Sequence, residues 1–135
     1  MKRWIVFGLM LVIVSGCSES TRQDFIERGD VVDVHGAVSN VEKLEQFMEN
    51  RDEVTVVRYT TEGDPIFYTL RGKDGGIFIK RNTKQDDYGP KGISTAVCHT
   101  LTKEGHSFVL NGCEGDFIGD DGRYVLLKVQ SERTP

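Results

Sequence analysis

The sequence predicts an α+β fold in which one amphipathic helix packs on a mainly antiparallel sheet of about five or six strands. Two observations support this prediction. Apolar residues recur at helical spacing only once, between Val41 and Met48, and from Glu53 onward short β-rich runs alternate with turn signals. One helix ahead of a run of strands is typical of an α+β domain, and short hairpin connections make neighbouring strands antiparallel.

The helix is predicted to begin at a capping box formed by Ser39 and Glu42, in which each side chain accepts a hydrogen bond from a free backbone N–H of the first turn. Its apolar stripe is Val41, Leu44, Phe47 and Met48, and it is expected to end near residues 50–51. A brief strand over residues 30–36 precedes it. The further strands are predicted over residues 54–61, 66–70, 77–81, 94–102, 107–112 and 124–130.

The first seventeen residues have the pattern of a bacterial lipoprotein signal. Lys2 and Arg3 are followed by an apolar run over residues 4–14 and then by Val14-Ser15-Gly16-Cys17. The run is far shorter than the roughly 20 residues that a bilayer span needs, so we expect a cleaved signal peptide at residues 1–16. Cys17 would then carry a diacylglycerol. A plain secretory signal is the nearest alternative, but it would leave Cys17 as a free thiol.

The predicted organisation is therefore a signal peptide (1–16), a lipidated cysteine with a polar tether (17–29) and a single α+β domain (30–131). Removal of Lys2 and Arg3 leaves 15 of the 17 basic residues against 21 acidic ones, so the net charge falls from −4 to −6. An acidic domain without a basic patch argues against a nucleic-acid partner. It also implies that lipid on Cys17, rather than charge, attaches the chain to the outer face of the cell membrane.

Assignment of Cys17 to lipid leaves Cys98 and Cys113 as an even pair, for which a disulfide is the default outside the cytoplasm. The turn supports this pairing independently. If Gly105-His106 forms a type II′ hairpin, Glu104 faces Ser107, and stepping outward along both strands brings Cys98 opposite Cys113. Zinc bound by these cysteines and neighbouring histidines is the alternative, but their spacing matches no compact zinc site.

One loop region offers candidate binding or catalytic residues. Arg58 and Tyr59 precede a turn that contains Glu62 and Asp64, and two carboxylates in a loop could bind a cation or act as an acid and a base. Turn formation by Gly63 and Pro65 explains the same residues without a site. No catalytic motif stands out in the sequence, and we expect neither a cofactor nor a bound metal.

The residues also carry a family likeness. The runs Asp30-Val31-Val32 and His35-Gly36, and above all the block Tyr59-Thr60-Thr61-Glu62-Gly63-Asp64-Pro65-Ile66-Phe67, resemble the short Gram-positive lipoproteins grouped as domain of unknown function 4362. Cys98 and Cys113 are similar to the cysteine pair of that family. The resemblance implies a lipid-anchored domain on the outer leaflet of a Gram-positive membrane, and no activity comes with it.

These observations favour a non-enzymatic module that binds an envelope protein, a peptide or a wall component near the membrane. The competing hypothesis is a small-ligand or hydrolytic site built on Arg58, Tyr59, Glu62 and Asp64. Convergence of these four side chains in a closed pocket would favour the enzyme. An open or grooved sheet face with aromatic side chains would favour the binding module.

Overall fold

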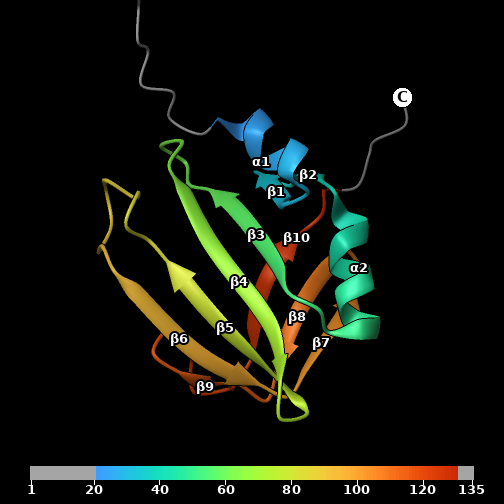
Figure 1. Cartoon of the computed structure of the whole chain (residues 1–135). Coiled ribbons are helices and arrows are strands. Elements are labelled where there is room, and N and C mark those ends of the chain that lie inside the picture. Colours follow the sequence, from blue (N-terminus) through green and yellow to red (C-terminus); the bar gives the residue numbers. More distant parts are fainter. Residues whose placement is uncertain (1–20, 131–135) are drawn as a thin grey trace, which may run out of the picture.

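The computed structural model describes residues 21–130. These residues form two helices and ten strands, and the strands assemble into two sheets (Figure 1). The strands of the larger sheet, sheet A, follow the order β2-β1-β3-β4-β5-β6-β9, and those of the smaller, sheet B, the order β10-β8-β7. The elements are α1 (Arg22–Arg28), β1 (Val31–Val34), β2 (Ala37–Ser39), α2 (Val41–Asn50), β3 (Val54–Tyr59), β4 (Pro65–Lys73), β5 (Gly76–Asn82), β6 (Ile93–Cys98), β7 (Thr100–Glu104), β8 (Ser107–Asn111), β9 (Glu114–Gly115) and β10 (Tyr124–Lys128).

The predicted α+β fold with one helix and a single sheet is wrong. Strands contain 47% of the described residues and helices 15%, and the strands divide between a seven-stranded and a three-stranded sheet. The division occurs inside the run predicted as one strand over residues 94–102. The chain bends at His99, so that β6 pairs in sheet A and β7 pairs in sheet B. The result is a two-layered β structure rather than a helix laid across one sheet.

The bend at His99 is matched on the returning chain by Gly112. The backbone of Gly112 has a φ of +63°, and a Cβ there would lie only 2.3 Å from Cδ2 of His99, so this close approach requires glycine. The disulfide between Cys98 and Cys113 lies beside this crossing, with the two Cα atoms 4.0 Å apart. Inside it, β7 and β8 pair in the predicted register, with Glu104 opposite Ser107.

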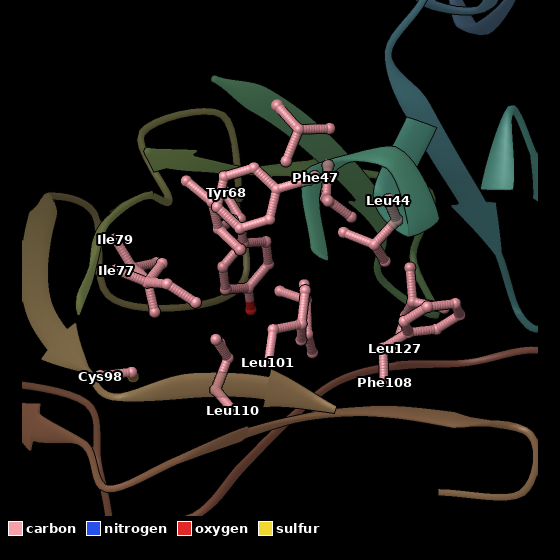
Figure 2. Close-up of a cluster of buried hydrophobic side chains, with 14 of the residues drawn as sticks. Leu44, Phe47, Tyr68, Ile77, Ile79, Cys98, Leu101, Phe108, Leu110 and Leu127 are labelled. Carbon is pink, nitrogen blue, oxygen red and sulfur yellow. The ribbon is translucent and has the colours of Figure 1, made fainter. Parts of the chain in front are cut away.

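The main core fills the space between the inner face of sheet A and sheet B. Figure 2 shows Tyr68, Ile77 and Ile79 of sheet A converging with Leu101, Phe108 and Leu110 of sheet B. Leu44 and Phe47 of α2 complete the same cluster, and both are almost fully buried. The apolar stripe predicted for α2 therefore packs as expected, although it closes the side of the two-sheet core.

The predicted capping box of α2 does not form. Ser39 ends β2, and the residue at the helix N-cap is Asn40, which has a φ of +59° and no side-chain cap. The Asn40 amide instead donates hydrogen bonds of 2.9 Å to the carbonyl oxygens of Ile26 and Asp30. One side chain thus joins the start of α2 to α1 and to the residue before β1.

A second, smaller cluster lies on the outer face of sheet A. It consists of Phe25 of α1 together with Val32 and Val57. Residues 22–28 were predicted to belong to a polar tether, but they form α1, which ends at Gly29 with a φ of +93°. The predicted signal peptide and Cys17 lie outside the described residues.

Candidate functional site

An open groove with a volume of about 1210 Å³ lies beside α1. Three segments form its walls: α1, the turn between β3 and β4, and the segment after β5. We call it the α1 groove. It is lined by Thr21, Arg22, Gln23, Phe25, Arg28, Tyr59, Gly63, Asp64, Pro65, Phe67, Asn82, Lys84, Gln85 and Asp87.

Aromatic side chains form the floor of the groove. Alternation along a strand sends Val57 and Tyr59 of β3 to the outer face, and the pairing of Val57 with Phe67 places Phe67 beside them. Phe25 packs edge-on against Phe67, with the ring centroids 5.4 Å apart. Because Phe25 is buried against the sheet, it anchors α1 beside the groove.

Charged side chains surround this floor. The Arg22 guanidinium lies over the Tyr59 ring, 5.3 Å from its centroid. Burial raises the pKa of the Tyr59 hydroxyl, and the nearby Arg22 partly offsets that rise. Arg28 forms an ion pair with Asp30, whose Oδ2 accepts a hydrogen bond from Nε at 2.9 Å. The groove therefore combines an apolar floor with a predominantly basic wall at α1.

Hydrogen bonds donated by backbone N–H groups hold the opposite wall of the groove together. Thr60 N donates to Asp64 O at 2.9 Å, and Asp64 N donates to Thr60 Oγ1 at 3.1 Å, which closes the turn between β3 and β4. Gly63 within it has a φ of +91°, as expected for the glycine of a tight turn. The Asp64 carboxylate then accepts a hydrogen bond from Asp87 N at 3.0 Å, which ties the turn to the segment after β5.

The four residues predicted as a possible site do not converge. Tyr59 and Asp64 line the α1 groove, whereas Glu62 is exposed at the turn. Arg58 points to the inner face, where its Nε donates to Asp33 Oδ2 at 3.2 Å. Arg58 lines a separate hollow of about 330 Å³, which Tyr59 also borders. The hypothesis of a closed catalytic pocket built on these four side chains lacks the geometry that it requires.

Several of the residues that line the groove were not predicted from the sequence. Arg22, Phe25 and Arg28 fell in the predicted tether, and Lys84 and Asp87 fell in a loop to which no role was given. The apolar pair Phe25-Ile26 was the one signal in the tether, since a solvated linker does not need two adjacent large apolar residues. Nothing local in the sequence indicates that Phe25 meets Phe67.

Residues 21–130 contain neither a metal-binding cluster nor a membrane-spanning helix. No group of three or more His, Cys, Asp or Glu side chains in this part of the chain could hold a metal ion. Neither helix between residues 21 and 130 is long and apolar enough to cross a membrane. Within that range, the α1 groove is the main candidate for molecular recognition.

Fold and groove together define a small two-sheet β domain with an open, amphipathic surface groove. Residues 28–108 match the family described as a domain of unknown function (DUF4362), and the chain belongs to that family. The matched range contains β1 to β7, including the β3–β4 turn that walls the groove. No curated protein and no solved structure gives a significant match to the chain.

Proposed function

We propose that this protein is a lipid-anchored binding module that holds a segment of an envelope protein or a peptide in the α1 groove, outside the cytoplasm. The observation that carries this proposal is the groove itself, an open channel with an aromatic floor and charged walls. Its volume of about 1210 Å³ exceeds the roughly 300–1,000 Å³ of typical small-molecule pockets. An extended chain segment fits such a channel better than a small substrate does.

The composition of the groove supports recognition of a polypeptide. Tyr59, Phe25 and Phe67 supply apolar surface at its centre, and charged and amide side chains surround them. Protein interfaces have the same anatomy, with aromatic residues at the core and a polar rim. Hydrolysis has less support, because Arg58 binds Asp33 and lines a different hollow from the one that Asp64 lines.

The anchor would keep this groove close to the membrane. Cys17 precedes Arg22, the first residue of α1, by five positions, and a fully extended chain covers at most about 3.6 Å per residue. A lipid on Cys17 would therefore hold the start of α1 within about 18 Å of the acylated thiol. Cys17→Ala should move the protein from the membrane fraction to the soluble fraction, and continued membrane association of that variant would contradict the anchor.

Site-specific crosslinking of the full chain in its own membrane tests the groove. A photo-reactive amino acid at Gln85, an exposed residue that lines the groove, should trap a discrete polypeptide partner. The matched control is the same amino acid at Glu49, an exposed residue of α2 that lies outside the groove. Equal adducts at both positions, or none at Gln85 at any light dose, would refute the proposed function.

A further inference from the structure

The outer face of sheet A continues beyond the α1 groove as an open surface. Phe67 and Asn82 oppose each other in the register of β4 and β5, and both line the groove. Two residues further along these strands Thr69 opposes Lys80, and beyond them Arg71 opposes Phe78. Alternation places all of these side chains on the same face.

Three cations gather on this surface. Lys80, Arg71 and Lys73 are exposed and project from the outer face of β4 and β5. The Arg71 guanidinium lies 4.8 Å from the centroid of the Phe78 ring, and Lys73 Nζ lies 5.5 Å from it. We call these four residues, Arg71, Lys73, Phe78 and Lys80, the basic face.

These cations are free of ion pairs within residues 21–130. The salt bridges found there involve Arg28, Arg58, Lys91, Lys103 and Arg123 instead. Two carboxylates lie on the same side of the sheet. Glu53 directly precedes β3, and one step beyond the Val54–Leu70 pair places it beside Arg71, although no ion pair joins the two. The other carboxylate is that of Glu114, on the edge strand β9. The register leads from Arg71 to Phe78, Val97 and Glu114, so three strand spacings, or about 14 Å, separate that carboxylate from Arg71.

The basic face contrasts with the chain as a whole, whose net charge is −4. At the groove end, Lys84 and Arg22 extend the positive charge toward α1. The groove carboxylates of Asp64 and Asp87 already have partners, namely a backbone N–H and the Lys91 ammonium at 3.1 Å. A cluster of three cations that form no ion pairs in the described part of the chain, on an acidic protein, attracts an oppositely charged partner and repels one of like charge.

We propose that the segment bound by this protein is acidic, with an apolar residue in the α1 groove and carboxylates on the basic face. The proposal rests on the groove function above and adds the chemistry of the partner. Arg71 and Lys73 are two positions apart on one strand, a spacing of about 6.8 Å, which equals the spacing of alternate side chains in an extended peptide. From Phe67 to Lys73 is six residues, about 20 Å, so a segment of six to eight extended residues covers both regions.

The test measures binding of defined peptides to the full-length protein, purified from membranes in a nonionic detergent. The first probe is a fluorescent peptide with a Leu-Phe pair followed by six aspartates. The second has the same sequence with asparagine in place of each aspartate, and the third is inorganic polyphosphate. We expect the aspartate peptide to bind at 50 mM salt and to weaken at 300 mM salt, because exposed charge pairs are screened. The asparagine peptide should bind at least tenfold more weakly.

Charge reversal locates the contact. The double variant Arg71→Glu, Lys80→Glu should weaken the aspartate peptide about tenfold or more, since it removes two favourable pairs and adds two repulsive ones. The matched control is Lys43→Glu, Lys128→Glu, which changes net charge equally at two exposed residues away from the basic face. This control should change affinity less than twofold.

The outcomes separate this inference from the proposed function. Equal binding of the aspartate and asparagine peptides, no effect of Arg71→Glu, Lys80→Glu, or binding of polyphosphate without the aspartate peptide would each overturn the acidic-segment proposal. If crosslinking at Gln85 still traps a polypeptide in those cases, the groove function stands and only the chemistry assigned to its partner is wrong. Loss of crosslinking at Gln85 would remove both.

Discussion

The disulfide should stabilise the fold mainly by lowering the conformational entropy of the unfolded chain. It closes a loop of 15 residues that contains the whole β7–β8 hairpin. In the loop-entropy treatment, a crosslink over that length removes about 10 cal/mol/K of conformational entropy from the unfolded state, or about 3 kcal/mol at 25 °C. Reduction should therefore lower the free energy of unfolding by about 3 kcal/mol and leave the folded packing in place.

Comparison of reduction with mutation separates entropy from packing. Cys98 and Cys113 are 1% and 5% exposed, so replacing both by alanine also removes buried atoms from the core. Cys98→Ala, Cys113→Ala should consequently lose about 1 kcal/mol more than reduction does, from the atoms removed and the space they leave. Serine variants would be less informative, because they would bury hydroxyl groups.

Urea unfolding followed by far-UV circular dichroism measures these free energies. Tryptophan fluorescence is unsuitable, because the single tryptophan, Trp4, belongs to the predicted signal peptide and not to the predicted domain. Reduction should also raise the denaturant slope, since a chain without the crosslink expands further when it unfolds. A difference below about 1 kcal/mol between oxidised and reduced protein, with an unchanged slope, would refute the unfolded-state explanation.

Three further predictions concern the core, the helix junction and α1. The hydroxyl groups of Tyr124 and Tyr68 lie 2.7 Å apart, so Tyr124→Phe should cost about 1–2 kcal/mol in urea unfolding by leaving Tyr68 without this partner. Burial raises the pKa of the Tyr124 hydroxyl above its ordinary value of 10.0, so with rising pH the unfolded chain loses the hydroxyl proton before the folded chain does. The free energy of unfolding should therefore fall as the pH rises past about 10, by up to about 1.4 kcal/mol per pH unit. Tyr124→Phe should flatten this fall. Asn40→Gly keeps the positive φ but removes the two hydrogen bonds that the Asn40 amide donates. It should lower the protection of backbone amides near α1 against hydrogen exchange by about 1–2 kcal/mol. Unchanged protection would contradict the role given to the Asn40 amide. Phe25→Ala should release α1, so that trypsin cuts at Arg28 faster while the main core unfolds at the same urea concentration; unchanged cleavage would show that Phe25 does not anchor the helix.

Local patterns predicted the elements whose signals lie within a few residues. Leu44 and Phe47 marked the buried face of α2 correctly, because helical spacing alone determines which side chains share a face. The turn at Gly105 similarly set the register of β7 and β8, and Gly105 has the positive φ that the predicted turn requires. In each case the decisive information is contained in one short stretch.

The division into two sheets could not be read in the same way. The run around Cys98 and His99 contains no glycine or proline, and β-forming residues continue across the bend. The bend depends on Gly112, which becomes relevant only when the returning chain packs against His99. Likewise α1 has only seven residues, too few to be stable in water alone, so it forms because Phe25 finds Val57 and Phe67 on the sheet.

Only part of the candidate site could be predicted from the sequence, because the groove also depends on contacts between remote parts of the chain. Asp64 was selected because it lies in a recognisable turn and Tyr59 because it precedes that turn, and both line the groove. Arg58 was selected as their neighbour in the chain, but adjacent residues of a strand point to opposite faces, and that rule alone separates Arg58 from Tyr59. The opposite wall and the helix that completes the groove come from remote parts of the chain.

The borders of sheet A affect how neighbouring copies behave. Its edge strands, β2 and β9, have three and two residues, whereas the β4 strand between them has nine. A long exposed edge offers a ladder of free N–H and C=O groups onto which another chain can add a strand, and such short edges offer little of it. Copies of sheet A held close together on one surface would therefore find few free backbone groups on β2 and β9 for strand-to-strand pairing, while the outer face of the central strands stays accessible to a partner.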